Sequence, residues 1–372
     1  MRTDRITFRS GPMIDMPLLL GIVLVATLGI VNLYSATSVY IDAGQRAGLA
    51  DIYVSQVYWI VVGGLLAILA AAVDYRHLER LAYVLYLVGI VSLLTVLVLG
   101  ADIRGSSRWI QLGGFTFQPS EFMKIFLILV IAKHLHNDPK TEPRTLLDLA
   151  PPIGLAALPT ALVMMQPDLG TSIVYLLTAA SILAMTKIRR RSLMWLALVG
   201  GVGVPFAYKY LLHDYQRARI TSFLDPEGDK TGAGWHAFQS KTAIGNGQIW
   251  GEGFMQGTQN QFGFLPDQHS DFPFAVFAED WGFVGGVVLI ATYAFLCVWA
   301  VNVAAQAKDR FGAALAIGVG ALVFWHTIAN MGMALGLLPV VGITLPLFSY
   351  GGSSVVTILV SLGLLMNVSM RR

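Results

Sequence analysis

The sequence predicts an all-α membrane protein whose chain crosses the bilayer about ten times, as a single transmembrane domain over residues 1–372. Hydrophobic residues make up 55% of the chain and charged residues only 13%, about half the charged fraction of soluble globular domains. The mean hydropathy is +0.65, and apolar runs recur at about the 20 residues that a helix needs to cross a bilayer. Disorder is excluded, because disordered chains combine low hydrophobicity with high net charge.

Charge, cysteine content and missing motifs narrow the functional class further. The formal net charge of +3 is too small for a protein that binds nucleic acid through a basic domain. The single cysteine, Cys297, excludes a disulfide framework and a zinc site built from cysteines. No P-loop, HExxH or DxD motif occurs in the sequence, so neither ATP hydrolysis nor these forms of metal chemistry are indicated.

Ten apolar segments are predicted as spans. The eighth is long and interrupted by Gly282, Gly285 and Gly286, so we expect it to bend or to protrude from the membrane. The fourth is the least hydrophobic, since Glu121 and Lys124 lie in its first turns. The predicted spans are 17–34, 57–73, 81–99, 122–134, 147–165, 169–185, 193–212, 272–301, 311–335 and 345–368.

Basic residues indicate the orientation of these spans. Lys and Arg concentrate in every second connection and at both ends of the chain, most densely in 186–191 (TKIRRR). Because cytoplasmic connections carry the excess of Lys and Arg, both termini are expected in the cytoplasm.

One connection, 213–271, is far longer than the others and is expected on the outer side. It contains charged residues, three histidines and aromatic residues throughout, and it is not of low complexity. Long ordered loops are usually functional, and its composition favours short helices lying at the membrane surface.

Asp271 directly precedes the eighth span, and two interpretations of it are open. A carboxylate in an apolar, partly dry environment can act as a general base. An Asp at a helix start can instead be an N-cap, accepting hydrogen bonds from free backbone N–H groups. Glu279 and Asp280 follow, and on a straight helix Glu279 would lie about 12 Å deeper in the membrane. Such acids are either functional or engaged in hydrogen bonds between helices.

A group of charged residues precedes and opens the fourth span. Glu121 and Lys124 are three residues apart on one helix face, and Arg104 and Arg108 precede them on the same outer side. Three cations at one mouth suit an anionic head group, since Arg binds phosphate in a bidentate manner. The alternative is a Glu121–Lys124 ion pair that only neutralises both charges.

The last two spans also contain polar residues. Segment 345–354 (LPLFSYGGSS), which includes Ser349 and Tyr350, predicts a broken helix start of the kind that lines a cavity in membrane proteins. His326 and Asn330 lie one helical turn apart and chiefly indicate hydrogen bonds between helices, with ligand binding as the alternative.

Motifs in a fixed order from the fourth span to the last are similar to those of one family. The chain resembles the SEDS proteins (shape, elongation, division and sporulation) over nearly its whole length, and their elongation branch more than their division branch. The motifs are 108–112 (RWIQL), 117–124 (FQPSEFMK), 166–171 (QPDLGT), 213–219 (HDYQRAR), 223–226 (FLDP), 239–241 (QSK), 257–259 (GTQ), 264–266 (FLP), 269–272 (HSDF) and 345–353 (LPLFSYGGS).

The resemblance implies a fold of ten transmembrane helices and a bacterial inner-membrane location. It implies a peptidoglycan glycosyltransferase that polymerises lipid II at the outer face, releasing undecaprenyl pyrophosphate. The expected partners are lipid II, the growing lipid-linked glycan, a class B penicillin-binding protein that supplies the transpeptidase, and other membrane proteins of the elongation complex.

The resemblance also implies roles for individual residues. Asp271 corresponds to the essential catalytic carboxylate of the family. The expected substrate-binding residues are Glu121, Lys124, Arg104, Arg108, Lys241 and His269, and those expected to support them are Glu279, Ser349 and Tyr350. The chain departs from the family pattern at Pro273 and at Asp280-Trp281, which affects local packing but leaves Asp271 in place.

Two questions stay open at this level. The charge of the leaving pyrophosphate needs stabilisation by basic residues or by a divalent cation such as Mg²⁺ or Mn²⁺, and the sequence does not decide between them. The alternative functions are a flippase for the lipid-linked precursor, which needs charges along a path through the membrane, and a non-catalytic scaffold of the elongation machinery.

Overall fold

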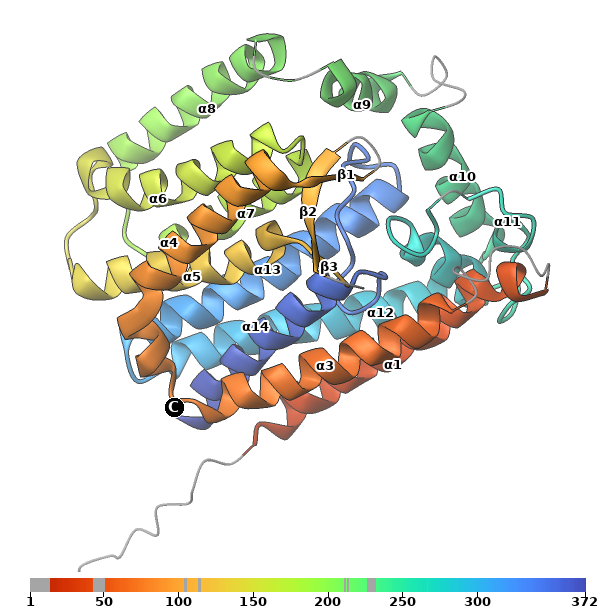
Figure 1. Cartoon of the computed structure of the whole chain (residues 1–372), viewed down its shortest axis with the longest axis horizontal. Helices are drawn as coiled ribbons and strands as arrows, with labels where there is room; N and C mark the ends of the chain where they lie inside the picture. The colour runs from red at the N-terminus through yellow and green to blue at the C-terminus, as the bar shows by residue number, and fades with distance from the viewer. Residues whose placement is uncertain are drawn as a thin grey trace, which may run out of the picture.

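A computed structural model describes residues 14–42, 51–103, 106–112, 115–210, 212, 214–225, 232–265 and 267–372. All ten predicted spans correspond to long helices, which lie side by side in one bundle (Figure 1). These helices are α1 (Met16–Asp42), α3 (Ile52–Ala72), α4 (Tyr75–Leu99), α5 (Pro119–Asn137), α6 (Leu146–Met165), α7 (Leu169–Ala184), α8 (Arg190–Tyr210), α12 (Pro273–Ala305), α13 (Arg310–Ala334) and α14 (Gly352–Met370).

Eight of these described helices are long and apolar enough to cross a membrane by length and composition alone. The two exceptions have physical reasons. Helix α7 has only 16 residues, and α5 carries Glu121, Lys124 and Lys133. Both helices are shielded by neighbours, since α5 packs against α4, α7 and α13, so neither must present its polar groups to lipid.

The long connection forms short helices, as the sequence predicts. They are α9 (Asp214–Leu224), α10 (Ala233–Asn246) and α11 (Thr258–Gln261), which lie towards one end of the bundle, opposite the C-terminus (Figure 1). At that end the structure also has a small antiparallel sheet that the sequence does not predict. Its strands β1 (Ala101–Ile103), β2 (Ser106–Leu112) and β3 (Phe115–Phe117) pair in the order β1-β2-β3.

The last helix begins later than predicted. Helix α14 starts at Gly352, seven residues after the predicted start at 345. Pro346 lacks a backbone N–H for a helix, and Leu347 has a φ of +61°, which a right-handed helix does not accommodate. The broken start predicted for this segment is confirmed.

Helix α12 is a hairpin of two helices that meet at Gly282, where φ is +65° and ψ is −163°. A Cβ on Gly286 would lie 3.8 Å from the ring of Phe274, twelve residues earlier. On a straight helix, twelve residues span about 18 Å. The chain therefore reverses direction at Gly282, and the bend predicted for this segment is confirmed in a stronger form.

Contacts with α1 give the direction of each half. In the first half, Asn32 donates to the carbonyl of Pro273 at 3.0 Å, and Ser35 lies 2.5 Å from Asp280. Residues 273–281 therefore run in the same direction as α1. In the second half, Trp299 donates to Asp15 at 2.9 Å, so residues 283–305 run in the opposite direction.

This arrangement corrects the predicted depths of the acids. Residues 273–281 form a re-entrant half-helix, with Asp271 at its deep end and Glu279 at its shallow end. Glu279 accepts the backbone N–H groups of Gln259 at 2.8 Å and Asn260 at 3.2 Å, both in the long connection. The prediction that Glu279 lies deeper than Asp271 is wrong, because it assumed a straight helix.

Gly282→Ala tests the reversal. The added Cβ would lie 2.3 Å from the Gly251 nitrogen and 2.6 Å from the Ile249 carbonyl oxygen, in a backbone conformation that disfavours any side chain. We expect a loss of roughly 1–3 kcal/mol in unfolding free energy, measured by chemical denaturation in detergent. Gly64→Ala is the matched control, since nothing lies within 4 Å of its Cβ position. Equal stability of the two variants would contradict the hairpin.

Candidate active site

A cavity of about 590 Å³ opens at the end of the bundle where the short helices lie. The starts of α5 and α7, the middle of α13 and the irregular segment before α14 form its walls. Seven charged side chains line it: Arg108, Glu121, Lys124, Asp168, Arg219, Asp267 and Asp271. A second cavity of about 560 Å³ adjoins it, and the two share Trp109, Thr116, Ser270, Tyr350, Gly351 and Ser353.

Glu121 and Lys124 form a buried ion pair at the floor of the cavity, 2.8 Å apart. Their relative exposures are only 6% and 2%. Pro119 starts α5 immediately before them, and Tyr175 from α7 donates to the Ser120 carbonyl at 2.6 Å. The Glu121–Lys124 ion pair, given above as the alternative to an anion receptor, therefore exists, and it lies inside the predicted site.

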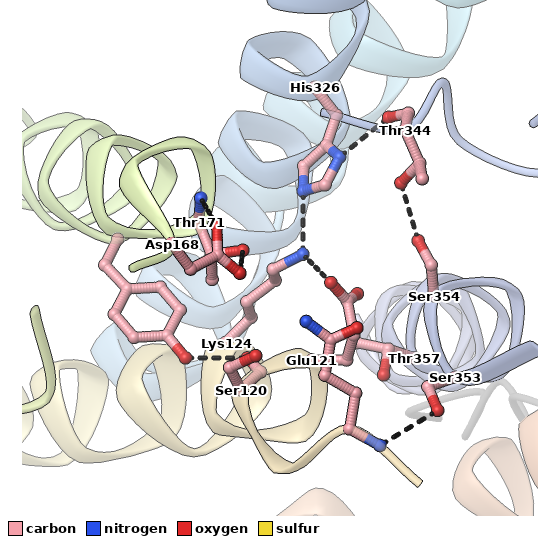
Figure 2. A network of polar contacts seen from close by, with 12 residues as sticks. Ser120, Glu121, Lys124, Asp168, Thr171, His326, Thr344, Ser353, Ser354 and Thr357 are labelled. Carbon is pink, nitrogen blue, oxygen red and sulfur yellow. Dashed lines mark hydrogen bonds and ion pairs between the residues drawn. The ribbon is translucent and has the colours of Figure 1, made fainter. Parts of the chain in front are cut away.

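His326 makes the third contact of this group. Figure 2 shows Lys124 reaching from α5 towards His326 on α13, with Nζ 3.1 Å from Nε2. The other ring nitrogen, Nδ1, lies 2.9 Å from the Thr344 carbonyl oxygen, which only accepts. Nδ1 must therefore carry the proton, and Nε2 accepts from Lys124. His326 thus links Lys124 to the segment before α14.

Arg108 lies on β2 at the cavity wall, beside the start of α7. Its guanidinium lies 3.6 Å from Asp168 and donates to the carbonyls of Gln166, at 3.0 Å, and Pro167. Asp168 in turn caps α7 by accepting from the Thr171 backbone N–H at 3.0 Å. The small sheet thus carries a predicted substrate-binding cation to the same cavity as Lys124.

Asp271 lines the cavity and is half-buried. Asn330, fully buried on α13, donates to the carbonyls of Asp271 at 2.9 Å and Ile343 at 2.8 Å, which fixes the backbone on both sides of the cavity. A Cβ on Gly342 would lie 3.7 Å from the Asp271 carboxylate. The N-cap of α12 is Phe272, which makes no side-chain cap hydrogen bond, so Asp271 lies one residue before the cap position.

The other predicted site residues divide into two groups. His269 lines the second cavity, and Tyr350 lines both cavities. Ser349 is buried and accepts the Leu345 N–H at 2.7 Å, so it shapes the segment before α14. The second group does not line either cavity: Lys241 is exposed on α10, and Glu279 accepts a backbone hydrogen bond from the long connection. Arg104 lies outside the described residues.

Several cavity residues were absent from the predicted site. Asp168, Arg219 and Asp267 add charge, and Trp109 adds an aromatic surface shared by both cavities. Asp168 and Arg219 lie in motifs 166–171 and 213–219, so the motifs held the signal for both. Trp109 likewise lies in motif 108–112. Asp267 lies between motifs 264–266 and 269–272 but in neither, and a turn brings it to the cavity.

The charges of the cavity are nearly balanced. Among the described residues, three basic and four acidic side chains line it, so Arg108 and Lys124 share the cavity with acids that the sequence did not place there. Among the described residues, no group of three or more His, Cys, Asp or Glu side chains is arranged to hold a metal ion. A metal centre built only from these described residues therefore does not fit.

Apolar side chains close the bundle beneath the ion pair. Leu127, Ile128 and Ile131 follow Lys124 on α5 and are each at most 1% exposed. The cavity thus ends at Lys124 and His326.

The bundle and its charged cavity define a multi-pass helical membrane protein with a polar site at one end. The sequence model of a protein family, the FtsW/RodA/SpoVE cell cycle proteins, matches residues 16–372 of the chain. The chain belongs to this family, and it is a multi-pass protein of the bacterial inner membrane.

Named relatives resemble the chain over nearly its whole length. It is 38% identical to the peptidoglycan glycosyltransferase MrdB of Escherichia coli, over 91% of this chain and 90% of the relative. It is 37% identical to the probable peptidoglycan glycosyltransferase FtsW of Trichlorobacter lovleyi, with coverages of 95% and 93%. It is 33% identical to stage V sporulation protein E of Bacillus subtilis, covering 98% of each.

Solved structures share the fold. One match is a chain from a structure that describes how a peptidoglycan synthase complex coordinates polymerization and crosslinking. That chain is 32% identical to this one, with a TM-score of 0.82, and the match covers 96% of this chain and 98% of that one. The rod shape determining protein RodA of Thermus thermophilus has a TM-score of 0.70 and 29% identity, with coverages of 96% and 97%.

Glu121→Gln tests the buried ion pair. The substitution leaves the Lys124 ammonium buried without its counter-charge, and breaking a buried pair in this way costs about 3–5 kcal/mol. We expect a loss of that size in unfolding free energy, measured by denaturation in detergent. The double variant Glu121→Gln/Lys124→Met removes both charges and should recover most of it. A double variant less stable than the single variant would contradict this account.

Proposed function

We propose that this protein is a peptidoglycan glycosyltransferase that polymerises lipid II into glycan strands during cell elongation. The names of the relatives support the activity, and 38% identity to MrdB supports the elongation branch. The observation that carries the proposal is one cavity that brings Asp271 together with the Glu121–Lys124 pair and Arg108. The similarity to a chain of a peptidoglycan synthase complex supports action beside a class B penicillin-binding protein and other elongation proteins.

In this mechanism Asp271 is the general base. The 4-hydroxyl of the acceptor N-acetylglucosamine loses its proton to Asp271 while its oxygen attacks the anomeric carbon of N-acetylmuramic acid on the growing chain. The bond from that carbon to undecaprenyl pyrophosphate breaks, and the α-linkage inverts to β. General-base assistance of this kind contributes roughly 10²–10⁴ in rate. Asn330 positions Asp271 by holding its backbone carbonyl.

The leaving pyrophosphate requires positive charge. Arg108 and Arg219 line the cavity wall, and Lys124 lies at its floor. Because four acids line the same cavity, these cations are partly neutralised before substrate binds. A divalent cation brought by the pyrophosphate therefore stays a second proposal beside the basic residues, and titration with EDTA during polymerisation measures it.

We propose that both termini lie in the cytoplasm and that the cavity opens at the outer face. Lys187 and Arg310 lie at the ends of α7 and α13 opposite the cavity, where the excess of basic residues supports a cytoplasmic surface. The lipid-linked sugars of both substrates then lie at the membrane surface beside Asp271. His269 and Tyr350, in the adjoining cavity, contact the second sugar.

The flippase and the scaffold account for less of the structure. A flippase needs polar groups along a path through the bundle, whereas buried apolar side chains follow Lys124 along α5. A scaffold needs no cavity in which an acid is held by a dedicated buried amide such as Asn330.

Asp271→Asn tests the mechanism. The amide keeps the size of the side chain but cannot take up a proton, so we expect glycan synthesis to fall by about 10²-fold or more. The measurement uses purified full-length protein with lipid II, and a gel of the glycan products.

The matched control is Asp214→Asn, because Asp214 lies in the same connection and its side chain is fully exposed. Both variants should retain expression, membrane insertion and transpeptidase binding. Near-normal synthesis by the Asp271 variant would remove this residue from the mechanism and direct attention to Glu121.

Cysteine labelling tests the orientation. In a Cys297→Ser background, a membrane-impermeant thiol reagent should label Asp214→Cys in intact cells and should not label Arg190→Cys until the membrane is permeabilised. Both positions are exposed, so access to the reagent depends on the side of the membrane alone. The opposite pattern would overturn the proposed orientation while leaving the activity assay unaffected.

A further inference from the structure

A smaller cavity of about 360 Å³ lies at the other end of the bundle from the candidate active site. The connection between α5 and α6, the connection between α7 and α8, and the first turn of α13 surround it. Helices α5, α7 and α13 therefore each carry active-site residues towards one end and border this cavity at the other.

The backbone around this cavity is fixed by a two-point bridge between the connections. Arg144 donates its N–H to the Lys187 carbonyl at 2.7 Å, and its own carbonyl accepts from Arg189 at 3.0 Å. The Arg144 side chain is buried and donates to the Asp138 carboxylate at 2.7 Å. The cavity is thus a built feature, in which the positions of its charged groups are set by hydrogen bonds.

Four basic side chains line the cavity, and two of them are already paired. Arg144 pairs with Asp138, and Lys140 pairs with Asp148. Lys187 and Arg310 have no acidic partner among the described residues, and both are exposed on facing elements. Glu142 is the one acid among the lining residues described. The cavity therefore offers two available cations to an anion.

The cavity also has an apolar floor. Leu135 and Ala314 are buried beneath the charges, and Met185 is 44% exposed beside them. Apolar and basic side chains therefore lie side by side in this cavity.

We propose that this cavity binds the phosphate of an anionic phospholipid. Lys187 and Arg310 contact the phosphate, and Leu135, Met185 and Ala314 contact the glycerol and the first carbons of the acyl chains. Basic pockets between helices on the cytoplasmic side are suited to anionic head groups, which are abundant in that leaflet. The inference rests on the proposed orientation for the leaflet, but binding itself does not depend on the orientation or on glycosyltransferase activity.

A bound phospholipid would link the far end of α7 to the start of α13. The same two helices reach the candidate active site, at Asp168, the N-cap of α7, and at His326. We therefore expect phosphatidylglycerol to raise the thermal stability of the bundle as a whole.

The test compares two double variants of the full-length chain that lose the same charge. Lys187→Gln/Arg310→Gln removes both available cations of the cavity. Arg190→Gln/Lys308→Gln is the matched control, because both residues are exposed nearby and do not line the cavity. Native mass spectrometry measures phosphatidylglycerol retained from a mixture with phosphatidylcholine. Thermal unfolding is measured in nanodiscs with and without phosphatidylglycerol.

The cavity variant should retain about tenfold less phosphatidylglycerol than the wild type and the control, and should lose the stabilisation. The single variant Lys187→Gln should show a smaller loss, which keeps the test valid where the double variant is unstable. If both double variants retain equal amounts of phosphatidylglycerol, the lipid is held only by general attraction to the basic surface, and the proposal is overturned. Inorganic phosphate and glycerol 3-phosphate are tested in phosphatidylcholine nanodiscs. If either stabilises the protein as much as phosphatidylglycerol does, the site binds a soluble anion and the proposal of a bound phospholipid is overturned.

Discussion

Irregular backbone inside a membrane bundle persists only where protein groups satisfy its hydrogen bonds, and the rest of this structure depends on that constraint. Two irregular segments, 267–273 and 343–349, meet at the candidate active site. Single polar side chains on otherwise apolar helices bind their carbonyls one by one. These pairs are Asn32 with Pro273, Asn330 with Asp271 and Ile343, His326 with Thr344, Tyr293 with Pro346, and Gln56 with Ser349. The helices thus hold two non-helical segments in one arrangement at bilayer depth.

Much of the fold and part of the site were predictable from local sequence. The ten helices follow from apolar runs of the right length, and the motifs at 117–124 and 269–272 indicated Glu121, Lys124 and Asp271, which the structure brings to one cavity. The one-turn spacing of His326 and Asn330 chiefly predicts hydrogen bonds between helices. That interpretation is right in kind, although their partners are carbonyls of an irregular segment and, for His326, also Lys124.

The features that could not be predicted depend on contacts between distant residues. The reversal at Gly282 requires the Gly247 and Gly251 backbone, some 30 residues earlier, to pack where side chains would collide. The glycines of 272–301 indicate a bend, but nothing in this segment alone distinguishes a bend from a complete reversal, so the sequence predicts the wrong depth for Glu279. Lys241 is the converse case: its motif suggests the site, whereas the residue is exposed on α10 and lines neither of the two cavities.

The hairpin of α12 has a consequence for how the protein is made. Residues 273–281 form a helix about 14 Å long, less than half the thickness of the hydrocarbon core, so this segment cannot be inserted as a span by itself. Residues 283–305 are long enough, and they fix the topology of the region. The half-helix must then dock from the side of the long connection, and its docking is what carries Asp271 to the cavity. A chain can therefore be fully threaded through the membrane, with every span correctly oriented, before its candidate base is in position.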